Sequence, residues 1–225
     1  MRKQVAPCCI RCLNPEEQDS YHYGSGFFVG KGTSQYLVTA SHVVDCGDPE
    51  ALPEILLGNG WAPVKGIFLP NDSKADIAVF RIEVDLSFPC LSLDCLSSSG
   101  LNVGQEVCIY GYPKSKPLLN KGIIDNKPAI VKARYAGLTL DDDSPSKDIC
   151  LWFEGISEPR LSGSPICFTH MEYPSEIRVA AVLAGDGKAF EDSHNEIRGF
   201  DAKYAVQAIE KDCVRPRPGT DLSHE

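Results

Sequence analysis

The apolar segments of this sequence are short, and glycine, proline, asparagine or aspartate interrupts them at close intervals. Runs of about four to eight residues bounded by turn-forming residues are typical of strands, whereas helices need longer stretches with a different periodicity. The pattern predicts strands at residues 27–29, 36–39, 54–57, 64–69, 77–82, 106–110, 129–136, 149–153, 165–168 and 177–183. We therefore expect an all-β fold.

One segment, residues 201–213, has the periodicity of an α-helix. Asp201 can cap its first turn. Its apolar residues fall on one face, which is expected of a helix packed on a core: Tyr204, Ala205, Ala208 and Ile209. The sequence after the helix, VRPRPGT, is rich in proline and glycine, so we expect residues 214–225 to form a mobile tail.

The length of 225 residues fits one domain or two small lobes of one domain. A serine- and glycine-rich stretch at residues 97–100 separates two strand-rich halves of similar size. We expect a single domain with an N-terminal lobe at about 20–93, an interlobe connection at about 94–104 and a C-terminal lobe at about 105–200. The helix at 201–213 and the tail complete it.

The formal charge of −9 argues against some classes of ligand. Nucleic acids and anionic membranes attract basic surfaces, so neither is expected as the main partner. No run approaches the roughly 20 apolar residues of a membrane span. The apolar residues near the N-terminus are interrupted by Pro7 and ended by Arg11, so they do not make a signal peptide, and a cytoplasmic location is expected.

The ten cysteines are too few for a disulfide scaffold, and we expect reduced thiols that pack as small hydrophobic residues. The cluster of Cys8, Cys9 and Cys12 has spacings that a zinc ion can use. A closed zinc site needs a second pair with comparable spacing, and Cys90 and Cys95 are the nearest candidates. No metal site is predicted.

Three segments carry the residue types of nucleophilic catalysis. LVTASHVV at 37–44 ends a strand with His42, ADIAVFRI at 75–82 places Asp76 before a strand, and RLSGSPI at 160–166 places Ser162 among small residues. A serine hydroxyl becomes a nucleophile when a neutral imidazole takes its proton, and a carboxylate fixes the tautomer of that imidazole. The three residues can fill these roles in the order His, Asp, Ser.

Each residue taken singly also has a simpler explanation. The histidine fits an ordinary turn, the aspartate a solvated strand end, and the Ser-Gly-Ser-Pro sequence a tight turn without function. Their joint occurrence, in this order and beside predicted strands, favours a catalytic triad. The remaining histidines lack comparable surroundings and are interpreted as surface or loop groups: His22, His170, His194 and His224.

In these pieces the sequence resembles the trypsin-like serine proteases, and most of all the compact HtrA/Deg-type peptidases. The resemblance extends over residues 20–204 and includes GSGF at 24–27, TASH at 39–42, ADIAV at 75–79, VGQEVCIYGYP at 103–113 and SGSP at 162–165. It implies two six-stranded antiparallel β-barrels of the chymotrypsin type with a C-terminal α-helix. The first barrel would supply His42 and Asp76 and the second Ser162, with no cofactor.

The resemblance also implies that backbone N–H groups of Arg160, Ser162 and Gly163 receive the oxyanion of the reaction. The family usually has glycine at the position of Arg160. Because a side chain resists a positive φ there, we expect the loop to rest with this N–H turned away. Activity would then depend on a protein partner or ligand that orders the loop.

By family geometry, the pocket for the residue on the acyl side of the cleaved bond lies about six residues before the nucleophile and along a later strand. The residues implied are Ile156, Val182, Leu183, Ala184 and Gly185. Their small or apolar side chains favour a small or medium aliphatic residue. The acidic residues nearby would select lysine or arginine instead if they pointed inward: Glu154, Glu158 and Asp186.

The sequence therefore predicts a serine endopeptidase that acts on polypeptides through an acyl-enzyme intermediate. The alternative is a catalytically silent trypsin-like domain that serves as a peptide-binding or regulatory module. Arg160 favours the alternative, whereas the complete triad opposes it. The sequence carries no signal for an oligomeric state.

Overall fold

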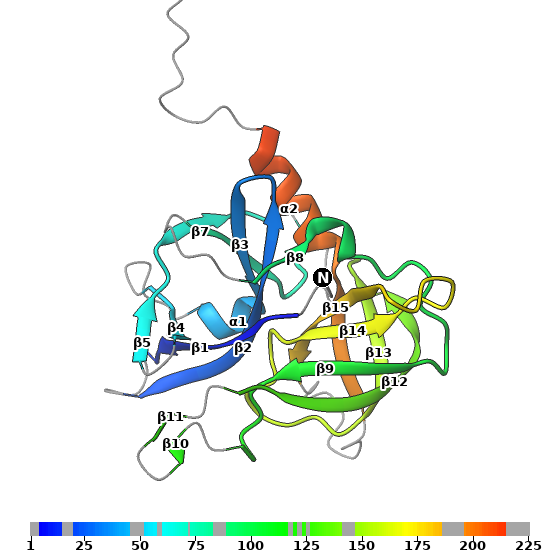
Figure 1. The fold of residues 1–225 in the computed structure, drawn as a ribbon, viewed down its shortest axis with the longest axis horizontal. Helices are drawn as coiled ribbons and strands as arrows, with labels where there is room; N and C mark the ends of the chain where they lie inside the picture. Colours follow the sequence, from blue (N-terminus) through cyan, green and yellow to red (C-terminus); the bar gives the residue numbers. More distant parts are fainter. Residues whose placement is uncertain are drawn as a thin grey trace, which may run out of the picture.

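The computed structural model describes residues 5–14, 20–45, 52–57, 60–71, 73–82, 89–116, 119–120, 123–124, 127–140, 147–185 and 196–214. Two β-rich lobes lie side by side, and the C-terminal helix α2 lies over the first lobe although it follows the second (Figure 1). The all-β class with a C-terminal helix, expected from the short apolar runs, is confirmed.

The first lobe is an eight-stranded sheet with the order β5-β4-β1-β2-β3-β7-β6, and β8 pairs in parallel with β2. Its strands are β1 (Pro7–Leu13), β2 (Tyr21–Lys31), β3 (Ser34–Thr39), β4 (Glu54–Leu57), β5 (Gly60–Pro63), β6 (Gly66–Leu69), β7 (Ala78–Ile82) and β8 (Leu91–Ser92). A short helix, α1 (Ser41–Val44), follows β3, and one 3₁₀ turn, η1 (Leu93–Cys95), follows β8. Over the described residues this sheet is a curled half-barrel and not a closed six-stranded barrel.

The second lobe is a closed barrel of six antiparallel strands in the order β12-β13-β16-β15-β14-β9, as predicted. The strands are β9 (Glu106–Gly111), β12 (Ala129–Leu140), β13 (Ile149–Gly155), β14 (Pro165–Thr169), β15 (Ile177–Gly185) and β16 (Glu196–Asp201). A two-stranded hairpin, β10 (Leu119–Asn120) and β11 (Ile123–Ile124), lies between β9 and β12 in sequence. Closure leaves this barrel without free strand edges.

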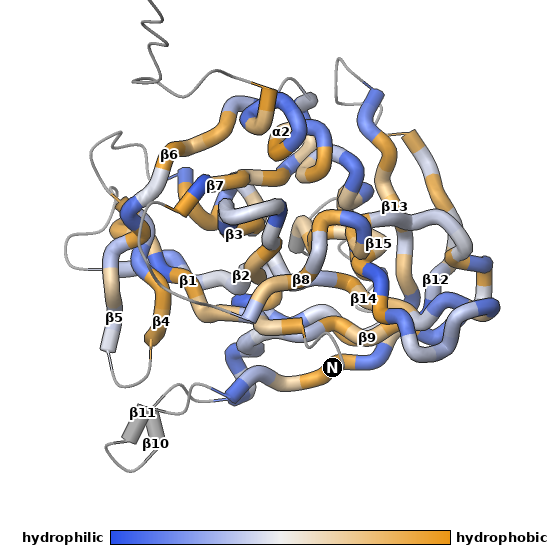
Figure 2. Tube along the Cα trace, turned by 45° about the horizontal axis from the view of Figure 1, so that its top comes forward, coloured by the Kyte–Doolittle hydropathy of each residue, from blue (hydrophilic) through white to orange (hydrophobic). Residues whose placement is uncertain are grey.

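Hydrophobic stretches follow the strands of both lobes (Figure 2). Each lobe has its own apolar cluster, and a larger cluster joins the two lobes and α2. This cluster includes Phe27 and Tyr36 of the first lobe and Val182 and Phe200 of the second. Because such burial contributes about 25 cal/mol per Å² of apolar surface, the interface fixes how the lobes sit against each other.

Helix α2 (Lys203–Val214) confirms the predicted helix to within two residues at its start. Asp201 caps it, because its Oδ1 accepts the backbone N–H of Lys203 at 2.8 Å. The predicted apolar face is the buried one: Tyr204, Ala205, Ala208 and Ile209. Val214, predicted to begin the tail, is the last residue of the helix, and residues 215–225 lie outside the described part of the chain.

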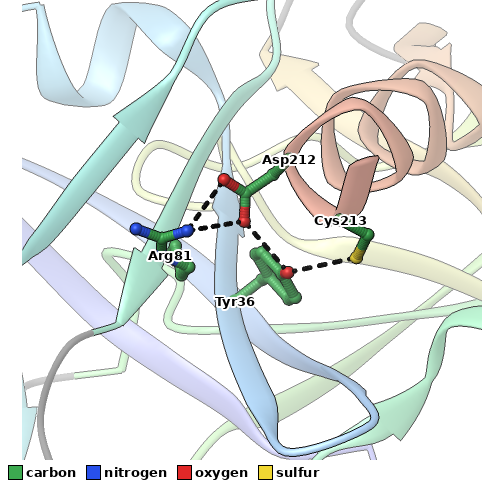
Figure 3. Close-up of polar contacts among 4 residues, drawn as sticks. All are labelled: Tyr36, Arg81, Asp212 and Cys213. Atoms are coloured by element: carbon green, nitrogen blue, oxygen red, sulfur yellow. Dashed lines mark hydrogen bonds and ion pairs between the residues drawn. The ribbon is translucent and has the colours of Figure 1, made fainter. Parts of the chain in front are cut away.

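The C-terminal end of α2 is fastened to the first lobe by a polar cluster (Figure 3). The carboxylate of Asp212 accepts hydrogen bonds from Arg81 Nη1 at 3.0 and 3.2 Å and from the Tyr36 hydroxyl at 3.2 Å. Cys213 Sγ lies 3.5 Å from the same hydroxyl. Burial raises the pKa of Tyr36, so the hydroxyl keeps the proton that it donates.

The predicted interlobe connection touches both lobes. β8, which lies just before the connection, pairs with β2, and within the connection the Ser97 N–H donates to the Val179 carbonyl in β15 at 2.9 Å. The Ser98 hydroxyl donates to Asp201 at 2.8 Å, so the connection also braces the start of α2. β1 adds residues before the predicted start of the first lobe at 20, and the other domain limits stay predictions.

The cysteine cluster near the N-terminus lies in β1, which the sequence did not mark as a strand. Neighbouring strand residues point to opposite faces, and accordingly Cys8 and Cys9 are buried in different apolar clusters. These two thiols therefore cannot share a metal ion. Cys12 is disulfide-bonded, so the expectation of reduced thiols is wrong at this position.

Candidate active site

His42 lies in the single turn of α1, directly after β3 ends at Thr39. Val43 is buried and anchors this turn on the core of the first lobe, while the His42 side chain is about half exposed, at 49%. The γ-carbons of Val43 occupy the space that a β-carbon on Gly24 would need. The glycine at this position in β2 thus lets the helix pack directly on the strand.

Asp76 precedes β7 and lies between two buried residues, Ala75 and Ile77, that fix its position. Asp76 Oδ2 lies 2.5 Å from Nδ1 of His42, and its Oδ1 accepts the backbone N–H of His42 at 2.9 Å. A carboxylate can only accept, so Nδ1 carries a proton and Nε2 is the nitrogen free to act as a base. The predicted pairing of His42 with Asp76 is present.

Ser162 lies in the tight turn before β14, and its backbone joins the first lobe. The Ser162 carbonyl accepts the N–H of Ser25 at 2.8 Å. Gly163 has φ 84°, and a β-carbon there would collide with the Ser25 carbonyl and Thr39 Oγ1. Gly163 therefore packs against Thr39, the last residue of β3, and Thr39 precedes His42 by three residues.

In the part of the chain that the structure describes, the Ser162 hydroxyl makes no hydrogen bond to the His42 ring. Such contacts often tighten only when substrate is bound. Ser162 is partly exposed, whereas Ser164, two residues later, is completely buried. A reagent can thus reach Ser162 and not Ser164.

The segment before Ser162 forms a turn in which the Leu161 N–H donates to the Glu158 carbonyl at 3.3 Å. Pro159 and Arg160 are its central residues, and Arg160 has φ 75°. A type II turn has φ of about +80° at this position and often has proline just before it. The expectation that the side chain of Arg160 would prevent a positive φ is therefore wrong.

Of the three predicted oxyanion donors, one is already engaged. The Gly163 N–H donates to the Leu183 carbonyl of β15 at 2.7 Å, so its inclusion among the donors is wrong. For the N–H groups of Arg160 and Ser162, no acceptor is found within the described ranges. These two N–H groups remain candidates for the oxyanion.

The predicted pocket is only partly consistent with the structure. Val182 and Leu183 are completely buried in the apolar clusters, so their side chains cannot line a pocket, and this prediction is corrected. Ala184 is partly buried, and Gly185 ends β15. Ile156 is 65% exposed. These last three residues stay predicted pocket residues.

The acidic alternatives for the pocket can be located in part. Glu158 Oε2 accepts the Ser115 N–H at 3.4 Å, so this carboxylate is turned toward the loop after β9. Glu154 is an exposed residue of β13. Asp186 lies outside the described residues.

Ser25 is part of the GSGF motif, which suggests no role for its hydroxyl, and the structure places Ser25 in contact with the turn of Arg160. Its hydroxyl donates to the Arg160 carbonyl at 2.9 Å, and the side chain is completely buried. The available signal was a serine between two glycines directly before an apolar run, because a polar group in such a place needs a partner if it is buried. The partner, 135 positions away, was not visible in the sequence.

Within the part of the chain that the structure describes, no group of three or more His, Cys, Asp or Glu side chains is arranged to bind a metal ion. Nor does that part contain a helix with the length and hydrophobicity to cross a membrane.

Comparisons with known proteins place the chain in a family. A sequence model for the family described as "Trypsin-like peptidase domain" matches residues 24–169, a range that includes His42, Asp76 and Ser162. No curated protein sequence matches the chain.

Solved structures resemble the chain over nearly its whole length. The active form of the Rv3671c protease from M. tuberculosis has a TM-score of 0.66 at 18% identity, covering 92% of this chain and 80% of that one. An inactive form of Rv3671c protease gives 0.59 at 15% identity, with coverage of 90% and 87%. Deg5 gives 0.61 at 17% identity, with coverage of 92% and 89%. At such identities the likeness establishes a shared chymotrypsin-like fold.

Proposed function

We propose that this chain, which belongs to the trypsin-like peptidase domain family, cleaves bonds within polypeptides through Ser162, His42 and Asp76. Membership of this family makes the chain a serine protease at the family level. The observation that carries the proposal is the double contact between Asp76 and His42. A solvated strand-end aspartate has no need to accept both the ring N–H and the backbone N–H of one histidine.

In the proposed reaction, Ser162 Oγ attacks the carbonyl carbon of the substrate while His42 Nε2 takes the hydroxyl proton. Asp76 stabilises the imidazolium that forms. The tetrahedral intermediate collapses when the amine leaves with the proton from His42, which gives an acyl-enzyme on Ser162. Water, activated by His42 in the same way, then releases the carboxylic acid and restores the serine.

The oxyanion of each tetrahedral intermediate would be received by the N–H groups of Arg160 and Ser162. One such donor contributes roughly 3 kcal/mol to transition-state stabilisation. The positive φ of Arg160 supports a turn that is formed at rest. We therefore propose that the protein has basal activity without an activating partner. The need for a partner, which the sequence predicted, is decided by the labelling experiment below.

The substrate is a polypeptide, and the reaction needs no cofactor. We propose that Ile156, Ala184 and Gly185 border the position of the residue on the acyl side of the cleaved bond. Their small or aliphatic character favours a small or medium aliphatic residue there. A library of fluorogenic peptides varied at that one residue tests this preference.

A labelled fluorophosphonate, which reacts only with an activated serine, tests the function directly. The unaltered protein should be labelled, and Ser162→Ala should lose both labelling and peptide hydrolysis. Its unfolding temperature should stay within roughly 1 °C, because a partly exposed hydroxyl contributes little to packing. Ser99→Ala, in the exposed interlobe connection, serves as the control and should keep its label.

The silent-domain alternative makes the opposite prediction for the same experiment. A peptide-binding module would bind peptides without labelling and without hydrolysis. Labelling that appears only after a protein partner is added would support the need for activation.

A further inference from the structure

The conformation of Arg160 needs an explanation from its surroundings. Residues other than glycine rarely adopt a φ near 75°, and the related type I turn, with φ of about −90° at this position, suits a side chain better. The two turn types differ by a flip of the central peptide, here that between Pro159 and Arg160. A flip to type I would reverse the direction of the Arg160 N–H and remove one of the two oxyanion donors.

Both peptide groups that flank Arg160 are held by their carbonyl oxygens. The Pro159 carbonyl accepts the backbone N–H of Lys114 at 2.9 Å, and the Arg160 carbonyl accepts the Ser25 hydroxyl at 2.9 Å. In a trans peptide the C=O and N–H point in opposite directions, so the Lys114 contact directs the Arg160 N–H away from Lys114. Fixing both peptide planes fixes φ and ψ of the residue between them.

The Ser25 hydroxyl can make this contact in one way only. Its oxygen also accepts the backbone N–H of Tyr112 at 3.0 Å. An N–H cannot accept, so the single hydroxyl proton of Ser25 is left for the Arg160 carbonyl. The backbone N–H of Ser25 meanwhile donates to the Ser162 carbonyl at 2.8 Å, and one buried residue thus holds both the turn and the nucleophile.

The side chain of Arg160 also contacts the first lobe. Its guanidinium lies over the ring of Tyr23, 5.2 Å from the ring centre. Tyr23 and Ser25 are both in β2, so the same strand contacts the side chain and the carbonyl of Arg160. A cation over an aromatic ring is attracted to it.

We propose that Ser25 and the backbone N–H of Lys114 are positioning groups that hold the turn at Arg160 in its positive-φ form, so that the oxyanion donors are set before substrate binds. This inference rests on the proposed function, because the direction of the Arg160 N–H affects catalysis only if it receives the oxyanion. It makes glycine unnecessary at this position of the chain.

A double-mutant cycle tests the role of Ser25. Ser25→Ala should lower kcat for a fluorogenic peptide about tenfold with little change in KM, since the donors act on the transition state. In an Arg160→Gly background, where positive φ costs little, the same substitution should lower kcat less than twofold. An equal loss in both backgrounds, or no loss in either, would overturn the inference.

Removal of the other contact tests Lys114. The Lys116 N–H donates to the Pro113 carbonyl at 3.0 Å, so Lys114 is the second residue of a turn, a position that accepts proline. Lys114→Pro removes the N–H, whereas Lys114→Ala removes only the side chain. The proline variant should have a kcat at least fivefold below that of the alanine variant. Equal rates would contradict a role for this N–H.

Crystal structures of the variants keep the test independent of catalysis. In Ser25→Ala the Arg160 residue should have a negative φ, and the Pro159 carbonyl should be turned away from Lys114. A positive φ retained in both Ser25→Ala and Lys114→Pro would refute the inference even if the unaltered protein were an active protease. Conversely, a flipped turn in a protein that never reacts with the fluorophosphonate would support the inference and reject the proposed function.

Discussion

Asp76 contacts His42 with both of its carboxylate oxygens, one at the ring Nδ1 and the other at the backbone N–H. The backbone contact fixes the start of α1 relative to the loop before β7, and the ring contact fixes the tautomer. The same carboxylate thus sets the position and the chemistry of the histidine. This arrangement links two segments that are 34 residues apart in the sequence.

The first prediction concerns this pair. Asp76→Asn should keep the fold, because an amide oxygen can still accept the His42 backbone N–H. The amide can no longer stabilise the imidazolium or enforce the tautomer, so kcat should fall by about three to four orders of magnitude. Steady-state kinetics measures the loss, and circular dichroism checks the fold. Asp94→Asn, at an exposed aspartate, is the control; near-normal turnover in Asp76→Asn would show that another acid assists His42.

The strands could be predicted where apolar residues formed a compact run. The prediction at 54–57 coincides with β4, and that at 106–110 misses only the last residue of β9. β1 was missed because three of its seven residues are cysteines, whose role in a strand is decided by what packs on them. The disulfide at Cys12 was missed for the same reason, since pairing depends on a partner brought near by the fold.

The candidate site was predictable in its residue types and not in its backbone. His42, Asp76 and Ser162 lie in distinctive local sequences, and the first two are in contact as expected. The φ of Arg160 could not be predicted, because it is set by hydrogen bonds from Ser25 and Lys114 in other parts of the chain. Local propensity gave the wrong sign of φ, and tertiary contacts decide it.

The second prediction concerns the contact of Gly163 with the first lobe. Gly163→Ala should lower the free energy of unfolding by more than roughly 3 kcal/mol, because a β-carbon adds backbone strain and collides with Ser25 and Thr39. Gly104→Ala is a matched control, since Gly104 has φ 85° but open space around it. It should cost about 1 kcal/mol. Equal costs in urea unfolding would mean that the lobes do not meet closely at Gly163.

The third prediction concerns the attachment of α2. Asp212→Ala leaves Arg81 and the Tyr36 hydroxyl without their acceptor, which costs about 1–3 kcal/mol. Alanine returns about 0.7 kcal/mol through its higher helix propensity, so the net loss of stability should be roughly 0.3–2.3 kcal/mol. Urea unfolding measures it.

The matched control for the helix attachment is an ion pair on the surface of the second lobe. Lys132 and Glu106 are paired at 3.0 Å, and both side chains are well exposed. Glu106→Ala should therefore leave stability unchanged, because water and salt screen such a pair. A loss from Asp212→Ala no larger than that from Glu106→Ala would show that the polar cluster does not fasten the helix.

The last prediction concerns thiol reactivity. Burial raises the pKa of Cys9 to about 12 and raises the pKa values of Cys8 and Cys167 further, so these thiols stay protonated and unreactive at pH 8. Cys213 is free and exposed. An aromatic disulfide reagent at pH 8 should label Cys213 quickly, and Cys213→Ser should remove this fast phase, whereas the three buried thiols should react only on unfolding.

Because Cys9 keeps its proton to higher pH when folded, its contribution to stability is full below the ordinary thiol pKa and is lost as the pH rises toward 12. The urea concentration at the unfolding midpoint should accordingly decrease as the pH rises above the ordinary thiol pKa. Rapid labelling of Cys9 in the folded protein at pH 8 would contradict its burial in the first lobe.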